Sequence, residues 1–358
     1  MKKYSKRVKF LTQAEFFSLF QKFISDSSKG YRVQKNGQRI KVQTIENYSY
    51  TCKLLEYFCN DTKFEIKLFL INHLTQKELN KAKQHWQQFY FKFTDFLYRR
   101  GYFDNYVGST IKIVRIFFNY LLQELQIQVG LFHKNFHVPK EDIPIVVFTP
   151  EQLKYLIHDK ALHEKLPPDL KITKDVFVFG CTVALRISDL VALKPFHLVK
   201  KGEGYYLQVK SKKTSTDTSL KLPDYAIQII KKYKNQQSTL LPQMSLGYFN
   251  KQLKELAKLI TDGEPMIKVR LKKGKPTMIY KDPEKRRHYT MADHITTHTM
   301  RRTAITTMLR LGVPEQVVRK ISGHTANSQE FFKYVAFSQS FQDNETDKLF
   351  EKLGTLDQ

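Results

Sequence analysis

Three segments of this chain carry the same helix-start pattern, a threonine followed three residues later by a glutamate or glutamine. They are Thr12-Gln-Ala-Glu15, Thr75-Gln-Lys-Glu78 and Thr149-Pro-Glu-Gln152. In such a capping box, the threonine oxygen accepts a backbone N–H of the first turn, and the acidic or amide side chain accepts the threonine's own N–H. The pattern predicts helices over residues 12–24 and 75–98, and a third that begins at residue 149. We therefore expect a mainly helical protein.

The length of the chain, 358 residues, is too great for one typical core and favours two domains. Further helical stretches are predicted over residues 44–59 and 107–125, and aromatic residues at helical spacing, such as Phe16, Phe20 and Phe23, indicate a core. Helical periodicity is then lost around two prolines, which is typical of a linker. The predicted division is a basic tail (1–8), a helical domain (9–131), a linker (132–148), a second domain (149–339) and a terminal tail helix (340–358).

The formal net charge of +26 indicates a polyanionic partner, either nucleic acid or an anionic membrane. The longest apolar run, residues 176–185, is too short to span a bilayer, and the basic N-terminus lacks an apolar signal core. Three cysteines without a Cys-x-x-Cys spacing predict neither a disulfide framework nor a zinc site. We expect a cytoplasmic protein that binds nucleic acid, with reduced cysteines.

The second domain opens with a predicted buried helix over residues 175–193, which is interrupted by Arg186 and Asp189. These two residues either form a helical ion pair, or Asp189 holds an arginine that grips a phosphate; the motif alone favours neither interpretation. A predicted hairpin follows, with strands at residues 205–210 and 219–222 and a lysine-rich tip. A partly buried lysine there could protonate a leaving oxygen. A second hairpin, over residues 267–280, is interpreted as a surface or backbone-contacting element without chemistry.

The C-terminal third carries the strongest signal. His298 and Arg301 lie three residues apart at a predicted helix start, where backbone N–H groups favour an anion. His324 follows the next predicted helix, and Tyr334 comes ten residues later. His294 and His298 have the spacing of a metal pair, but no third ligand accompanies them, and we predict no metal.

Together these residues resemble the tyrosine recombinases, or phage-type integrases. Thr182-Val-Ala-Leu-Arg-Ile-Ser-Asp is similar to the family's first arginine box, and His298-Thr-Met-Arg-Arg-Thr to its second. Ser322-Gly-His and Tyr334 complete the set, while Arg302 stands where many relatives have histidine. The resemblance implies a helical, SAM-like core-binding domain and a catalytic domain with a small β-sheet, which form a C-shaped clamp on DNA. With little sequence before the first helix, we expect the simple two-domain type without an arm-binding domain.

The implied reaction is attack by Tyr334 on a DNA phosphate, which forms a 3'-phosphotyrosyl bond and releases a 5'-hydroxyl. His298 would assist proton transfer, and Arg186, Arg301 and His324 would contact the nonbridging oxygens. Lys213 is the preferred proton donor to the leaving oxygen, with Lys210 and Lys212 as alternatives. Neither a metal nor ATP is implied.

The implied partner is double-stranded DNA, bound by a tetramer that joins two recombination sites, with accessory DNA-bending or directionality proteins as further partners. Phosphate contacts are predicted at Lys112, Arg115, Lys210 and Lys212. The tail helix either docks on a neighbouring subunit or packs on its own domain. Two other functions are considered: a type IB topoisomerase, which uses a similar arginine, lysine, histidine and tyrosine set, and an inactive DNA-binding regulator. The helical first domain and the tail after Tyr334 favour a recombinase over the first, and the complete residue set argues against the second, so we expect the integrase of a mobile element.

Overall fold

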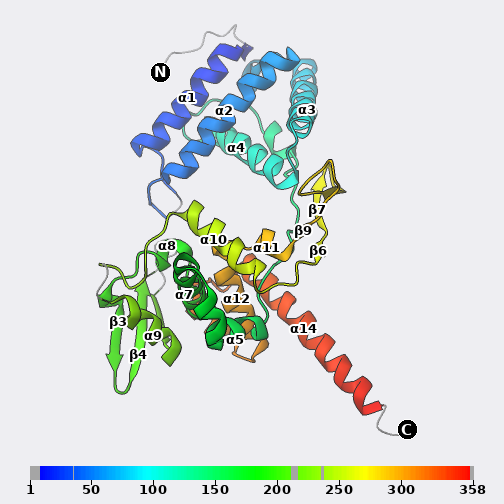
Figure 1. The fold of residues 1–358 in the computed structure, drawn as a ribbon. Coiled ribbons are helices and arrows are strands. Elements are labelled where there is room, and N and C mark those ends of the chain that lie inside the picture. The colour runs from blue at the N-terminus through cyan, green and yellow to red at the C-terminus, as the bar shows by residue number, and fades with distance from the viewer. Residues whose placement is uncertain (1–8, 35, 211–216, 235–237, 355–358) are drawn as a thin grey trace. The chain divides into compact units, whose positions relative to one another are not determined.

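The computed structural model describes residues 9–34, 36–210, 217–234 and 238–354, which form two compact units. The first unit consists of Met1–Ile143 and Val269–Ile279, and the second of Pro144–Lys268 and Tyr280–Gln358. Helices dominate both, and the strands form only sheets of two or three members (Figure 1). The predicted fold class, mainly α with a small β-sheet, is confirmed. Among the described residues, no helix is long and apolar enough to cross a membrane.

Four long helices build the first unit. They are α1 (Gln13–Lys29), α2 (Val42–Thr62), α3 (Gln76–Arg99) and α4 (Asp104–Gln123). The capping boxes at Thr12 and Thr75 are both present, as predicted, and α1 ends at Gly30, whose φ of 83° suits glycine. The predicted core aromatics Phe16, Phe20 and Phe23 are fully buried. Short elements complete the unit: β1 (Phe10–Leu11) paired with β2 (Leu68–Phe69), and the 3-10 helices η1 (Ile71–His73) and η2 (Phe132–Asn135).

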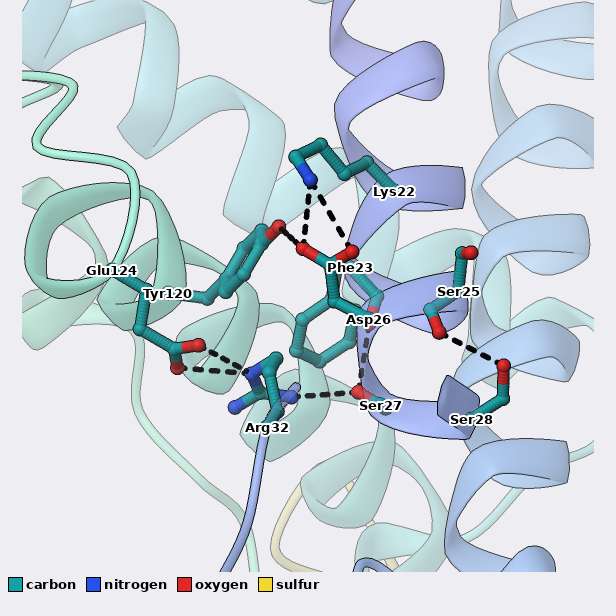
Figure 2. A network of polar contacts seen from close by, with 9 residues as sticks. All are labelled: Lys22, Phe23, Ser25, Asp26, Ser27, Ser28, Arg32, Tyr120 and Glu124. Atoms are coloured by element: carbon teal, nitrogen blue, oxygen red, sulfur yellow. Dashed lines mark hydrogen bonds and ion pairs between the residues drawn. The ribbon is translucent and has the colours of Figure 1, made fainter. Parts of the chain in front are cut away.

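A polar network fastens the end of α1 to α4 (Figure 2). The Tyr120 hydroxyl of α4 donates to Asp26 of α1 at 2.6 Å. Arg32 donates through Nε to Glu124 at 2.9 Å and through Nη1 to the Ser27 hydroxyl at 2.9 Å. Ser27 is buried, and its hydroxyl also donates to the Phe23 carbonyl at 2.7 Å, so this hydroxyl is satisfied as both donor and acceptor.

A hairpin from far along the chain completes the first unit. Its strands are β7 (Lys268–Lys272) and β8 (Lys275–Ile279). The buried Asp104 accepts the backbone N–H groups of Lys273 and Gly274, each at 2.9 Å. The buried Glu141 accepts from Arg270 Nη2 and from the backbone N–H of the next residue, both at 2.6 Å. The hairpin, which falls in the sequence range predicted for the second domain, is thus held by buried carboxylates of the first unit.

The first unit also extends beyond its predicted end at residue 131. Phe136 is buried in its core, and the unit continues to Ile143. A close approach explains one glycine of α4: a Cβ at Gly108 would lie 1.9 Å from the carbonyl oxygen of Pro139. The first part of the segment that sequence periodicity marks as a linker therefore belongs to the first unit, with His133, Phe136 and Glu141 buried.

The second unit is built around α7, which packs against α10 and α12. Its helices are α5 (Pro150–His158), α6 (Lys160–Lys165), α7 (Pro168–Val183), α8 (Ile187–Leu190), α9 (Asp224–Tyr233), α10 (Leu246–Lys258), α11 (Met291–His294), α12 (Thr297–Arg310), α13 (Glu315–Ser322) and α14 (Gln329–Gly354), with a 3-10 helix η3 (Pro195–His197). Its strands are β3 (Leu198–Lys201), β4 (Gly204–Lys210) and β5 (Asp217–Lys221), which form an antiparallel sheet in that order, and β6 (Pro265–Met266), which pairs with β9 (Tyr289–Thr290).

The structure corrects the predicted helix over residues 175–193. Helix α7 starts earlier and ends at Val183, because Ala184 adopts the left-handed conformation with φ 55°. Arg186 then precedes the short α8 as its N-cap. The first arginine box is therefore a turn between two helices and not the middle of one.

Two other predictions concern the tail and the cysteines. Helix α14 contains Tyr334 and runs without a break to Gly354, so the predicted tail helix continues the helix of the tyrosine; residues 355–358 and the N-terminal tail, 1–8, lie outside the described part of the chain. All three cysteines are buried, which agrees with the prediction that they are packing residues, and they are not paired in this structure.

Candidate active site

Helix α12 positions His298 and Arg301, at the helix start that the sequence predicts. The backbone N–H of Thr296 donates to the Thr299 hydroxyl at 3.0 Å, which caps the first turn. Arg301 is only 3% exposed, and its Nη1 donates to the Ala184 carbonyl at 2.8 Å. This bond connects the second arginine box to the turn that carries the first.

Arg186 and Asp189 of the first box act electrostatically on Arg301. Burial and the charge of the half-buried Arg186 lower the pKa of Arg301, whereas the buried Asp189 favours its charged form. A guanidinium keeps its proton at neutral pH in spite of such a shift. Two arginines held near one another supply the positive charge and the N–H donors that bind an anion.

His324 lies next to Arg301, directly after Gly323, whose φ of 64° ends α13. Arg301 Nη2 is 3.2 Å from Nε2 and 3.3 Å from Nδ1 of the imidazole. The Ser322 hydroxyl lies 2.8 Å from Nδ1. Burial, followed by the charges of Arg301 and Arg186, lowers the pKa of His324 to about 3. The ring is therefore neutral in this structure at neutral pH.

Tyr334 brings the candidate nucleophile to the same place from α14. The side chain is fully buried, and its ring centroid lies 6.0 Å from that of His324. Its hydroxyl has no hydrogen-bond partner that meets normal geometry among the described residues. Burial and then Glu330 raise the pKa of Tyr334, against the opposing charges of Arg302 and Arg301. The phenol is protonated and shielded from solvent, so it must become accessible before it can attack a phosphate.

His298 can serve as a proton acceptor. Its ring remains accessible to solvent although protein atoms surround it. Desolvation, followed by the charges of Arg302 and Arg301, lowers the pKa of His298, while Glu330 acts in the opposite direction. The imidazole is consequently neutral at neutral pH, which is the form that accepts a proton.

Arg302 is a residue whose role sequence reasoning missed. The sequence marks it only as a departure from the histidine of many relatives. In the structure, its guanidinium interacts with both Tyr334 and His298, and its Nε is buried without a partner among the described residues. The signal in the sequence was its place directly after Arg301, one turn beyond His298 on the same helix.

The lysine hairpin is described only in part. Lys212 and Lys213 lie outside the described residues, whereas Lys210 is exposed at the end of β4 and pairs in register with Asp217 of β5. The Thr218 hydroxyl of β5 donates to the carbonyl of Lys320 in α13 at 3.3 Å. The base of the hairpin is thus tied to the helix that precedes His324.

The two cations predicted on α4 differ in their surroundings. Lys112 is exposed, but Arg115 is half-buried and donates to the Phe136 carbonyl at 3.5 Å. Among the described residues, no group of three or more histidine, cysteine, aspartate or glutamate side chains is placed to hold a metal ion.

A known protein family resembles this chain in sequence, and solved structures resemble it in fold. The sequence model of the phage integrase family matches residues 147–339, more than half of the chain. A lambda integrase dimer bound to a COC' core site is 13% identical, with a TM-score of 0.57 over 91% of this chain and 78% of that one. XerH recombinase bound to a palindromic difH substrate is 14% identical, with a TM-score of 0.57 over 95% and 89%. The Tn1549 transposon integrase, residues 82–397 with transposon right-end DNA, is 15% identical, with a TM-score of 0.54 over 94% and 99%. No curated protein sequence matches this chain.

Proposed function

Because this chain belongs to the phage integrase family, we propose that it is a site-specific DNA recombinase that cleaves and rejoins strands through a 3'-phosphotyrosyl intermediate. The observation that carries the proposal is the contact between Arg301 and His324, whose ring lies next to that of Tyr334. Arg186 acts electrostatically on both Arg301 and His324, and His298 acts on His324. These are the residue types that covalent phosphoryl transfer requires: a nucleophile, a base, and cations for the phosphate.

In the proposed reaction, the Tyr334 oxygen bonds to phosphorus as the bond to the 5'-oxygen breaks. His298, neutral in the free protein, takes the phenolic proton directly or through water. Arg186, Arg301 and His324 stabilise the charge on the nonbridging oxygens. The phosphotyrosyl bond conserves the energy of the phosphodiester, so resealing needs no ATP, and the arginines supply the positive charge, so no metal is required.

Lys213 is the proposed acid that protonates the departing 5'-oxygen. This assignment is tested by the rate of cleavage of a strand with a 5'-bridging sulfur, because a thiolate leaves without a proton. Lys213→Ala should be slow on normal DNA and fast on the sulfur-containing strand. Lys210→Ala and Lys212→Ala serve as matched controls, and rescue of one of them instead would move the role to that lysine.

The proposed partners follow the likeness to solved complexes. Lambda integrase has been solved as a tetramer bound to a Holliday junction, and XerH on its difH site. We propose that this protein likewise assembles as a tetramer on two double-stranded DNA sites in the cytoplasm, to integrate or excise a mobile element. Accessory bending or directionality proteins would set the direction of the reaction. The excess of 60 lysines and arginines over 34 acidic residues supports an affinity that comes largely from phosphate contacts.

The deciding experiment incubates the protein in EDTA with a supercoiled plasmid that carries the DNA flanking the element. A covalent protein–DNA adduct on a denaturing gel, present with wild type and absent with Tyr334→Phe, is expected. Recombinant plasmids are expected beside it; relaxation without recombinants would indicate a topoisomerase. No adduct on the native flanking DNA would indicate a binding protein without strand-transfer activity and overturn the proposal.

A further inference from the structure

The hydroxyl of Ser322 lies between a backbone carbonyl and the imidazole of His324. Ser322 is 2% exposed, and its Oγ lies 2.6 Å from the carbonyl oxygen of Val318 and 2.8 Å from Nδ1 of His324. A hydroxyl has one proton, and a carbonyl can only accept. The contact of 2.6 Å between two oxygens therefore uses the hydroxyl proton. Toward Nδ1 the same hydroxyl can only accept, so Nδ1 must carry a proton.

The protonation of Nδ1 determines whether Nε2, the other ring nitrogen of His324, is a hydrogen-bond donor or acceptor. A neutral imidazole has one N–H, and hence Nε2 carries a lone pair. Arg301 Nη2 is nearly equidistant from Nε2 and Nδ1, at 3.2 and 3.3 Å. A group placed in this way, so close to both nitrogens, lies over the face of the ring and not in line with either lone pair. Since a guanidinium only donates, Arg301 is compatible with a lone pair on Nε2.

A phosphate oxygen also presents only lone pairs, and it cannot bond to a bare Nε2. We propose that Ser322 is a positioning residue that holds a proton on Nδ1 of His324, so that His324 must gain a second proton, on Nε2, before it can donate to the scissile phosphate. The phosphate in this inference rests on the proposed function, but the tautomer of the free protein does not. The proton comes from solvent when DNA binds and returns to solvent when the site empties.

The charges around His324 explain why the proton is gained only with the ligand. Burial, followed by the charges of Arg301 of α12, Arg186 before α8 and Arg319 of α13, lowers the pKa of His324 to about 3, and His298 of α12 acts in the same direction only when it is protonated. From α14, the rings of Phe331 and Tyr334 lie against the His324 ring. A phosphate bound beside these arginines would oppose their positive charge at the ring and so favour the imidazolium. Binding of the anion and protonation of His324 are therefore coupled.

Nitrogen-15 NMR of histidine side chains tests the tautomer directly, with the His324→Gln variant used to assign the signals. In the free wild-type protein we expect His324 to show a protonated Nδ1 and a bare Nε2. Addition of sulfate, a tetrahedral dianion that does not titrate near neutral pH, should raise the pKa of His324, so that in a pH titration Nε2 gains its proton at a pH more than a full unit higher than in the free protein. A free protein in which Nε2 carries the proton would overturn the proposal without any variant.

Two variants and one matched control test the role of Ser322. Ser322→Ala removes the acceptor and should shift the neutral ring toward the Nε2–H tautomer, whereas Ser322→Thr should keep the wild-type tautomer. Ser27→Ala is the control, because Ser27 is also buried, donates to a helical carbonyl at 2.7 Å and accepts from an arginine at 2.9 Å. An unchanged tautomer in a folded Ser322→Ala protein would overturn the proposal.

Strand cleavage gives the functional measurement. Single-turnover adduct formation by wild type should slow as pH rises, because the phosphate-bound His324 loses its second proton. This pH dependence should be flatter in Ser322→Ala and the same as wild type in Ser27→Ala. If no DNA yields an adduct but the NMR result holds, the proposed function fails and the role of Ser322 in setting the tautomer stands. If adducts form and Ser322→Ala retains the wild-type pH dependence, the positioning role is refuted while the recombinase function stands.

Discussion

The carboxylate of Asp104 accepts the backbone N–H of Lys273 at 2.9 Å, across 169 positions of the sequence. The same carboxylate accepts the Gly274 N–H at 2.9 Å and the Tyr98 hydroxyl at 2.8 Å, and it is 2% exposed. One aspartate therefore satisfies three donors, two of which belong to the hairpin turn. The first unit depends on a segment that the chain supplies from its second half.

Replacing Asp104 by alanine should destabilise the first unit, because buried donors would lose their acceptor. Each donor left without a partner costs about 1–3 kcal/mol, so we expect a loss of roughly 2–4 kcal/mol in the free energy of unfolding. Asp95→Ala is the control: Asp95 pairs with the exposed Lys273 ammonium, and such pairs are worth about 0–1 kcal/mol. Urea unfolding measures the free energy of unfolding of both variants. Equal losses in Asp104→Ala and Asp95→Ala would contradict the stabilising role of the buried carboxylate.

Gly180 of α7 lies where α12 packs closest. A Cβ there would be 2.4 Å from Sδ and 3.1 Å from Cβ of Met300, the residue before Arg301. Gly180→Ala should therefore displace Met300, cost about 1–3 kcal/mol in the free energy of unfolding, and reduce adduct formation. Gly247→Ala in α10 is the control, because a Cβ there meets no atom within 4 Å. This variant should leave adduct formation unchanged, and its stability should be unchanged or higher by up to about 1 kcal/mol. A Gly180→Ala protein with full stability and activity would show that α12 tolerates the shift.

Tyr334→Phe should abolish the adduct and yet leave the fold as stable as wild type or more so. The Tyr334 hydroxyl is buried and makes no hydrogen bond of normal geometry among the described residues, so removing it relieves a desolvation cost of about 1 kcal/mol. Tyr120→Phe is the opposite case, because that hydroxyl donates to Asp26 at 2.6 Å, and we expect it to lose about 1–3 kcal/mol. Thermal unfolding of the two variants compares them; a Tyr334→Phe protein as weakened as Tyr120→Phe would mean that the hydroxyl has a partner in solution.

Arg302→Gln should change the pH dependence of cleavage. After burial, the charge of Arg302 contributes most to the lowered pKa of His298, and the same charge opposes the rise in the pKa of Tyr334. Removing the cation raises both values. Since the proposed base is neutral His298, the acid limb of the rate should move to higher pH. Arg310→Gln, two turns along the same helix, is the control. Arg302→Lys should keep a pH profile of cleavage close to that of wild type. If the profile of Arg302→Gln also superimposes on that of wild type, the electrostatic role of Arg302 is excluded.

Lys112 and Arg115 should contribute to DNA binding in different ways. Lys112 is exposed, and Lys112→Ala should weaken binding to all sequences and reduce the slope of log K against log salt by about 1, with no change in stability. Arg115→Ala should also lower the free energy of unfolding, because its guanidinium donates to the carbonyl of Phe136, a core residue. Salt titrations by fluorescence anisotropy separate the two, and an unaltered slope in Lys112→Ala would remove this lysine from the interface.

Local rules allowed much of this protein to be predicted from its sequence. The helix starts at Thr12, Thr75 and Thr149 are set by hydrogen bonds within four residues, and all three form as predicted. The same holds for the start of α12, because its capping also lies in adjacent residues. The family was likewise within reach, since the order of the arginine, histidine and tyrosine residues along the chain carries the chemistry that the family shares.

Contacts between distant segments decided the rest, because no local pattern encodes them. The turn at Ala184 replaces a helix that apolar periodicity predicts, and its carbonyl is held by Arg301, 117 positions away. The hairpin around Lys273 joins the first unit because a buried carboxylate needs its N–H groups. At the site, the sequence alone determined which residue types are present. The tertiary structure decided their states: Tyr334 is buried and protonated, and Ser322 sets which nitrogen of His324 carries the proton, since burial and neighbouring charge determine where protons reside.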